Sequence, residues 1–139
     1  MSITLVNDGE ALLLKHIVNR LDYGNPVMRL YSNPVDITHL GEAITLNNLT
    51  ECDGYSAAVL TPGGWSVTRS PTSGITTAVY GPVTFSFTDT VQAYGYYVTG
   101  KDARGQETLI YLEQFISGGL FQLPRTGGQI AVTTRLSLT

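Results

Sequence analysis

Cys52 is the only cysteine in this chain of 139 residues, and it lies between two carboxylates, Glu51 and Asp53. Negative charges beside a thiol raise its pKa, whereas a catalytic cysteine needs a lowered pKa to supply a thiolate. The sequence therefore predicts that Cys52 is structural and not a nucleophile. A single cysteine also cannot form an intrachain disulfide, so the chain does not match a disulfide-stapled secreted module.

The sequence also contains no clear motif for binding a metal ion or a phosphate group. The two histidines, His16 and His39, have no Cys or Asp at the spacing of zinc ligands. Acidic residues around Cys52 lack the alternating oxygen ligands of a calcium-binding EF-hand. Glycine pairs such as Gly63-Gly64 do not match a phosphate-binding loop and are typical of turns between strands. We expect no metal, no cofactor and no catalytic residues, and we predict that the protein is not an enzyme.

The tyrosines are the one cluster of side chains in the sequence that could bind a ligand or another protein. Exposed aromatic rings on a β-sheet can stack on sugars or form the centre of an interface, whereas buried rings belong to the core. We assign two of the four tyrosines to the core and keep Tyr94 and Tyr111 as candidate interface residues. The four clustered residues are Tyr94, Tyr96, Tyr97 and Tyr111.

The tyrosines lie on a predicted β-hairpin that spans Val91–Phe115, with a polar, glycine-bearing turn at its centre. Tyr94, Tyr96 and Val98 are expected on one face. Because neither face of the second arm is clearly polar, we place that arm centrally in a sheet, covered on both sides. Gly95 lies between two tyrosines, and a glycine inside a strand often marks a close approach of another backbone.

Short strands separated by Gly and Pro turns are predicted around this hairpin. The last strand has the clearest alternation, with Ile130, Val132 and Thr134 on one face. About eight strands of this kind predict an all-β fold, an antiparallel β-sandwich of jelly-roll type. An immunoglobulin-like sandwich is the alternative. The other predicted strands are Val27–Tyr31, Tyr55–Thr61, Trp65–Arg69, Ile75–Tyr80, Val83–Thr88 and Gln129–Leu138.

A short N-terminal α-helix is predicted at Asp8–Leu21, because Asn7 and Glu10 form a capping box before apolar residues at helical spacing. Residues 1–24 then form an arm and helix on a single domain of residues 1–139. The apolar face of this helix is wide. Leu12 and Leu13 are therefore candidate contacts with another chain, although the same face would also suit a helix that caps the end of the sandwich.

The segment Ile37–Asp53 is long and weakly patterned, and we read it as a loop with one helical turn. Long loops in compact domains often dock on partners. Its candidate interface residues are His39, Leu46 and Leu49. Deleting residues 2–7 without any loss of binding or of oligomer mass would count against a role of the N-terminal arm in the same interface.

Charged residues make up only 14% of the chain, against about 25% in an average soluble domain. The net charge of −3 offers no basic surface for nucleic acid. No apolar run approaches the roughly 18 residues of a membrane span, and the N-terminus lacks the pattern of a signal peptide. We expect synthesis in a cytoplasm and no contact with membrane or free nucleic acid. The composition suits either a neutral, hydroxyl-rich surface or a surface that becomes buried in an assembly.

Several motifs together resemble small virion structural proteins of tailed bacteriophages, of the type that decorates or cements the head. The element Tyr94-Gly95-Tyr96-Tyr97-Val98-Thr99 is the most specific of them. The other matching pieces, in chain order, are Leu30-Tyr31-Ser32-Asn33, Gly54-Tyr55-Ser56-Ala57, Trp65-Ser66-Val67, Leu112-Glu113-Gln114-Phe115, Gly128 and the strand Ile130–Leu138.

The resemblance implies a non-enzymatic β-sandwich, made in the cytoplasm of a host bacterium, that binds the major capsid protein lattice on the outer surface of the virion. It also implies a homo-oligomer, and a trimer would suit the three-fold positions of the shell. Two alternatives stay open. One is a tail or fibre module that binds host glycans through Trp65 or exposed tyrosines, and the other is a hydrolase that would need two close carboxylates in a cleft.

Overall fold

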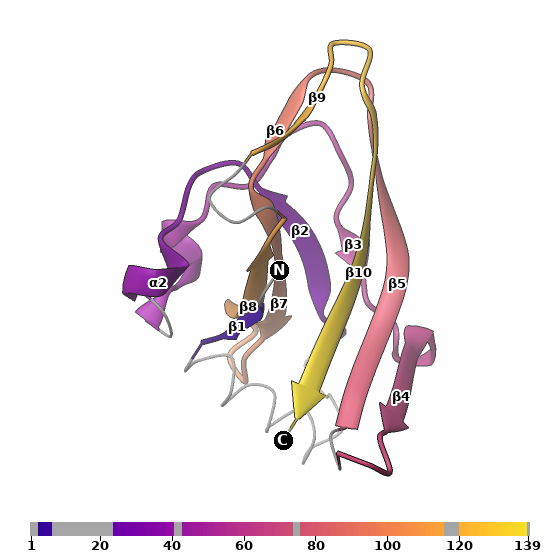
Figure 1. Cartoon of the computed structure of the whole chain (residues 1–139). Helices are drawn as coiled ribbons and strands as arrows, with labels where there is room; N and C mark the ends of the chain where they lie inside the picture. The colour runs from indigo at the N-terminus through magenta and orange to yellow at the C-terminus, as the bar shows by residue number, and fades with distance from the viewer. Residues whose placement is uncertain (1–2, 7–23, 41–42, 74–75, 116–119, 139) are drawn as a thin grey trace.

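The computed structural model describes residues 3–6, 24–40, 43–73, 76–115 and 120–138, and this part of the chain is mostly β with antiparallel sheets (Figure 1). A five-stranded sheet has the order β1-β8-β7-β2-β3, and a three-stranded sheet has the order β10-β5-β4. Strands β6 and β9 form a separate pair. The fold class predicted from the sequence is therefore confirmed as all-β.

The strands and short helical turns have the following bounds. The five-stranded sheet contains β1 (Ile3–Leu5), β2 (Val27–Tyr31), β3 (Ala58–Val59), β7 (Gly95–Lys101) and β8 (Glu107–Gln114). The three-stranded sheet contains β4 (Trp65–Arg69), β5 (Thr76–Phe87) and β10 (Gly128–Leu138). The remaining elements are β6 (Val91–Ala93), β9 (Phe121–Leu123), α2 (Ile37–Leu40), η2 (Leu46–Asn48) and η3 (Pro62–Gly64).

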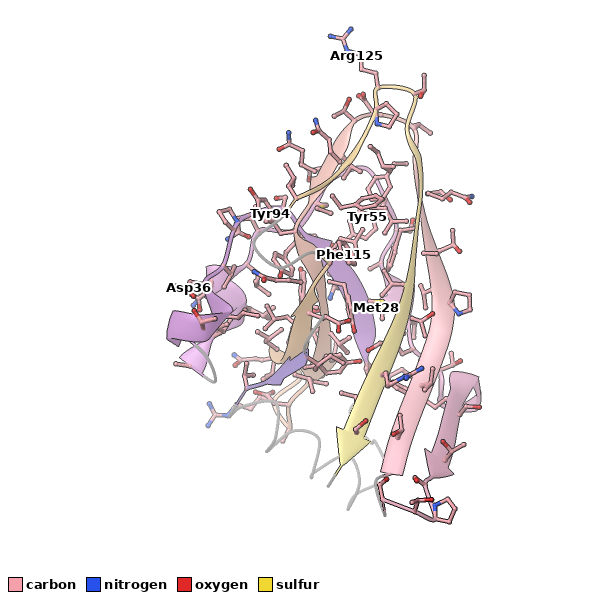
Figure 2. All side chains as sticks on the ribbon, viewed as in Figure 1. Met28, Asp36, Tyr55, Tyr94, Phe115 and Arg125 are labelled. Carbon is pink, nitrogen blue, oxygen red and sulfur yellow. The ribbon has the colours of Figure 1, made fainter. Side chains whose placement is uncertain are left out.

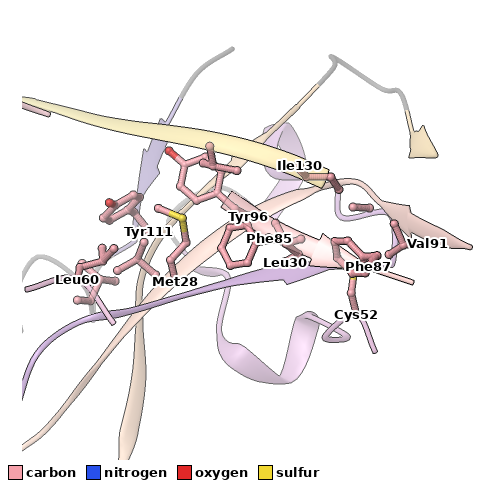
Figure 3. Packing of buried hydrophobic residues seen from close by; sticks show 14 residues of the cluster. Met28, Leu30, Cys52, Leu60, Phe85, Phe87, Val91, Tyr96, Tyr111 and Ile130 are labelled. Atoms are coloured by element: carbon pink, nitrogen blue, oxygen red, sulfur yellow. The ribbon is translucent and has the colours of Figure 1, made fainter. Parts of the chain in front are cut away.

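The main core lies between the five-stranded and three-stranded sheets (Figure 3). Alternation along each strand builds it, because every second side chain points to the same face. In β5, Phe85 and Phe87 are buried while Ser86 is exposed. In β10, Ile130 and Val132 are buried and their neighbours are exposed, as the sequence predicts. Buried side chains from β2 and β7 meet them from the opposite sheet.

A second core covers the other face of the five-stranded sheet. Residues 32–40 and 43–51, here called the covering segment, contain α2 and η2 and contribute Val35 and Ile44 to this core. Tyr31, Tyr97 and Leu112 contribute from the sheet. Strand β8 therefore lies between two apolar layers, and residues 109–113 are all buried. The predicted central, two-sided burial of this arm is confirmed.

The predicted hairpin is β7–β8, and a bulge in it changes which side chains share a face. Val98 pairs with Tyr111 and Thr99 pairs with Leu109, so Ile110 has no partner on β7. An extra residue of this kind reverses the alternation beyond it. Ile110 and Tyr111 both face the main core, whereas Leu109 joins the second core. Simple period-two alternation could not predict this arrangement.

The Gly81-Pro82 pair was expected to separate two strands, but the structure shows one continuous strand, β5. Val132 pairs with Val83 and Thr134 with Tyr80, so Gly81 and Pro82 together face Thr133 on β10. The peptide bond between them is cis. A bulge lets a strand hold a proline, which has no N–H for the ladder, and Gly81 has a φ of +122° that favours glycine.

Two further expectations differ from the structure. The strand predicted at Tyr55–Thr61 is reduced to Ala58–Val59, because Tyr55 (labelled in Figure 2) packs against the main core. Its ring meets Phe85 edge-on and Phe87 at a tilt, each with ring centroids 5.5 Å apart. Tyr94 and Tyr96 were expected on one face of the hairpin, but Tyr94 packs on the second core and Tyr96 on the main core. The alternation is broken because Tyr94 lies between β6 and β7 and belongs to neither strand. The helix predicted at Asp8–Leu21 lies outside the described residues.

Candidate functional site

The structure describes five of the seven residues that the sequence singles out as candidate contacts. Leu12 and Leu13 lie outside the described residues, and His39 lies in α2. Leu46, Leu49 and Tyr94 are half-buried against the second core. The covering segment thus uses its apolar side chains on its own sheet, and its remaining exposed surface is mostly polar.

Tyr111 is only 2% exposed, so its ring belongs to the main core. Its hydroxyl group lies 2.7 Å from the Oγ1 atom of Thr134 on β10, and Tyr96 Oη donates a hydrogen bond to the same Oγ1 at 2.9 Å. Thr134 is fully buried. Three hydroxyl groups therefore join the two sheets through the core, and the buried Tyr111 ring does not offer a contact surface for another chain.

Glu113 extends this buried polar group. It is 7% exposed and lies opposite Tyr96 in the ladder between β7 and β8. Burial raises the pKa of the Tyr96 hydroxyl, and the neighbouring Tyr111 and the Glu113 carboxylate raise it further. The phenol stays protonated and can act as a hydrogen-bond donor. The sequence contains one sign of this buried polar group. Thr134 is the polar residue among the inward positions of β10 that precede Leu136.

Cys52 is buried, with its Sγ atom 3.4 Å from the carbonyl oxygen of Gln92. Burial raises the pKa of the thiol to about 11, and the carboxylates of Asp53 and Glu51 contribute to the increase. The predicted direction of the pKa shift is confirmed, although burial and not charge is its largest cause. A thiol with this pKa is a poor nucleophile at neutral pH.

Arg29 is the centre of a polar cluster on the outer side of the five-stranded sheet. Its guanidinium forms an ion pair with Glu51 at 3.4 Å and donates hydrogen bonds to Glu107 and, at 3.0 Å, to the hydroxyl of Thr99. Tyr55 Oη donates to Glu51 at 2.9 Å and accepts a hydrogen bond from the Leu30 backbone. The cluster ties the end of the covering segment to the hairpin. Its ion pairs are partly exposed, so each adds little to stability.

Gly95 allows the second core to close over the sheet. Tyr31 is fully buried opposite Gly95 on β2, and its hydroxyl has no hydrogen-bond partner among the described residues. A Cβ atom on Gly95 would lie 2.6 Å from Tyr31 Oη and would also collide with the carbonyl oxygen of Glu113. The tyrosine ring fills the space that the glycine leaves empty, as in the aromatic rescue of strand glycines.

The outer side of the three-stranded sheet is rich in hydroxyl side chains and poor in charge. We call it the hydroxyl face, because seven of its eleven residues are Ser or Thr and one, Arg135, is charged. Thr77 Oγ1 and Ser137 Oγ lie 3.2 Å apart, and Gln129 donates to Ser86 at 3.4 Å. The face consists of Ser66, Thr68, Thr77, Val79, Thr84, Ser86, Gln129, Ala131, Thr133, Arg135 and Ser137.

Other chemical groups in the described part of the chain are sparse. Within it, no three His, Cys, Asp or Glu residues gather in a way that could hold a metal ion. No helix in this part is long and apolar enough to cross a membrane. The large apolar side chains that are exposed there are Val59 at 54% and Phe121 at 37%, on strands β3 and β9. The two residues are far apart in the sequence and lie in different sheets, so each is a single exposed apolar side chain.

Comparison with known proteins adds no relative: no protein-family model matches the chain, and neither a curated protein nor a solved structure is significantly similar to it.

Proposed function

We propose that this chain is a non-enzymatic structural protein of a bacteriophage virion, which decorates and stabilises the outer surface of the capsid as a symmetric oligomer. The observation that carries the proposal is the hydroxyl face, which has one charge among eleven residues. Neutral hydroxyl groups can be buried against a neighbour at far lower cost than charges, provided that they find hydrogen-bond partners.

The two-sided core supports the same role. The five-stranded sheet is packed on both faces, by the main core and by the second core, and close packing of this kind makes a stiff body. A stiff body loses little conformational freedom on docking, which favours binding to a repeating lattice. Many weak identical contacts on such a lattice then add up through multivalency.

The finer parts of the proposal come from the sequence. Residue patterns predict a jelly-roll-like sandwich and an N-terminal helix at Asp8–Leu21, in a segment that contacts neighbouring chains. The resemblance implies a homo-oligomer on the major capsid protein lattice, with a trimer matched to a three-fold axis. The protein would be made in the cytoplasm of the host bacterium and end on the virion surface. Membrane, free nucleic acid and cofactors have no part in this role.

The alternative of a glycan-binding tail or fibre module finds less support. Such a module needs exposed aromatic rings in a shallow groove. Trp65 is half-buried and makes an edge-to-face contact with Tyr80, with ring centroids 5.3 Å apart. The described tyrosines are all buried or half-buried. Among the described aromatic residues, Phe121 is the one classed as exposed, at 37%, and one ring is a small platform for a sugar.

Co-sedimentation with phage heads that lack decoration, with isolated tails as the control, tests the proposal. We expect saturable binding to heads at a stoichiometry that matches the lattice. Thr84→Glu adds a charge in the hydroxyl face and should weaken binding, whereas Ala103→Glu adds the same charge in the exposed β7–β8 turn and should not. Binding to tails alone, to neither particle, or equally by both variants would contradict the proposed function.

A further inference from the structure

Strand β10 leaves one long edge of the three-stranded sheet open. The sheet order is β10-β5-β4, so β10 pairs with β5 on one side, and no described strand pairs with its other side (Figure 1). Alternate residues of an antiparallel edge strand direct their N–H and C=O groups away from the sheet. Such a row of groups is a template for another extended strand.

The other edge strands are shorter. At the rims of the five-stranded sheet, β1 has three residues and β3 has two, and β4 at the opposite rim of the three-stranded sheet has five, whereas β10 has eleven. Residues 81–87 of β5 also have no described partner on the side of β4, but they form a shorter run than β10 and contain Pro82. Natural proteins protect long edges with Pro, Lys, bulges or inward-pointing charges. The sequence of β10 contains no Pro and no Lys, and the bulge opposite Thr133 lies in β5. Its single charge, Arg135, is exposed on the hydroxyl face.

We infer that β10 pairs with β10 of a second copy of this chain, antiparallel and centred on Thr133, so that the two three-stranded sheets join into one continuous sheet. This register is the one that overlaps all of Gly128–Leu138. It places Thr133 opposite its own copy and Arg135 opposite Ala131 of the other chain. A register centred on Arg135 would instead set two arginines against each other, and like charges directly opposite are destabilising.

The side chains of the strand fit this pairing on both faces. On the inner face, Ile130 meets Leu136 and Val132 meets Thr134 of the second copy, so three apolar side chains and one threonine from each strand continue the main core across the junction. On the outer face, Gln129 meets Ser137, and the hydroxyl face doubles in extent. Each pair brings together residues that already lie on the same side of β10.

The contact uses the same patch on both chains and therefore lies on a two-fold axis. On a capsid it would join neighbouring oligomers to one another and would not close a trimer. The inference does not depend on the proposed function, because it concerns the purified protein without heads. If the protein fails to bind heads, the proposed function is contradicted but the β10 pairing is not. If the protein binds heads but shows no β10 pairing in solution, only the inferred pairing is wrong.

Engineered cysteines test the pairing directly. Opposed residues of antiparallel strands have Cα atoms about 4.5–5.5 Å apart, within disulfide range. Thr133→Cys should therefore form a covalent dimer under mild oxidation, seen by non-reducing gel electrophoresis. Thr84→Cys is the matched control, because the two β5 strands would lie about 14 Å apart across the junction. The native Cys52 is buried, so the background of the unmodified chain should be low.

The register has its own control. Ala131→Cys alone should not crosslink, because the two copies of residue 131 would be offset by about 13 Å along the strands. Ala131→Cys combined with Arg135→Cys should crosslink. If Thr133→Cys reacts no faster than Thr84→Cys, or if Ala131→Cys alone crosslinks as well as Thr133→Cys, the proposed pairing is wrong.

Sedimentation gives an independent readout that needs no new thiol. Thr133→Lys places two lysines opposite each other on an exposed face. It should therefore halve the mass of the purified oligomer and raise the dissociation constant of the β10 pairing by about tenfold. Thr84→Lys should do neither. Equal mixing of Thr133→Lys with Thr133→Glu should restore the mass. A monomeric wild-type chain at the highest concentrations, or a Thr133→Lys variant of unchanged mass, would overturn the inference.

Discussion

Replacing Thr134 by Val tests the buried hydroxyl groups that join the two sheets. Valine keeps the shape of threonine, so little packing is lost and the effect comes from hydrogen bonds. Tyr111 Oη, 2.7 Å from Thr134 Oγ1, loses the partner that joins it to β10. An unpaired buried hydroxyl costs about 1–3 kcal/mol. Tyr96 keeps the Glu113 carboxylate beside it, so its loss is about 1 kcal/mol.

The free energy of unfolding should therefore fall by about 2–4 kcal/mol in the Thr134→Val variant. Urea unfolding followed by circular dichroism would measure this as a lower midpoint with an unchanged slope. Thr68→Val, at an exposed position on β4, is the control and should change stability by less than about 0.5 kcal/mol.

A double variant separates lost hydrogen bonds from lost packing. Adding Tyr111→Phe to Thr134→Val removes the unpaired hydroxyl, so the double variant should be more stable than Thr134→Val alone by about 1 kcal/mol. A Thr134→Val protein as stable as the Thr68→Val control, or a double variant that is weaker still, would refute the reasoning.

Three further outcomes are expected. Gly95→Ala should cost about 3 kcal/mol or more, since its Cβ would meet the Glu113 carbonyl oxygen as well as Tyr31; a thermal midpoint equal to that of the wild type would contradict this. Tyr31→Phe should leave stability unchanged or slightly raised, because the lost hydroxyl has no described partner; a loss above about 1 kcal/mol in urea unfolding would reveal a partner. Burial raises the pKa of Tyr97 from 10.0 to about 12 and that of Cys52 from 9.0 to about 11. The unfolded chain therefore releases these protons first, and the free energy of unfolding should fall as the pH rises from about 9 to about 12, while a flat profile over that range would argue against it.

Local patterns in the sequence were sufficient for several strands. The bounds of β2 and β4 match the predicted Val27–Tyr31 and Trp65–Arg69, and the alternation of β10 correctly predicts its buried side. The close approach at Gly95 was also predictable, because a strand glycine between large side chains indicates that another group needs the space. In each case the signal lies within a few neighbouring residues.

Features set by pairing between distant segments were not predictable in this way. The bulge at Ile110 depends on how β8 aligns with β7, and the continuity of β5 through Gly81-Pro82 depends on Thr133 of β10. Tyr55 leaves a strand-like pattern because Phe85 and Phe87 offer a better environment for its ring. Burial by a remote partner outweighs local β-propensity at such positions.

The second core makes the covering segment a less favourable interaction surface than the sequence suggested, and the three-stranded sheet a more favourable one. From the sequence alone, the covering segment looked free to dock on a neighbour, because Leu46 and Leu49 stand in a long loop without a clear pattern. In the structure those side chains pack on the segment's own sheet. A side chain that already shields a core gains little from a second partner, since the apolar area still exposed sets the gain. The hydroxyl face and the open edge of β10 have no such prior role among the described residues. Contacts between copies should therefore be sought first on the three-stranded sheet, with the polar exterior of the covering segment as a secondary surface.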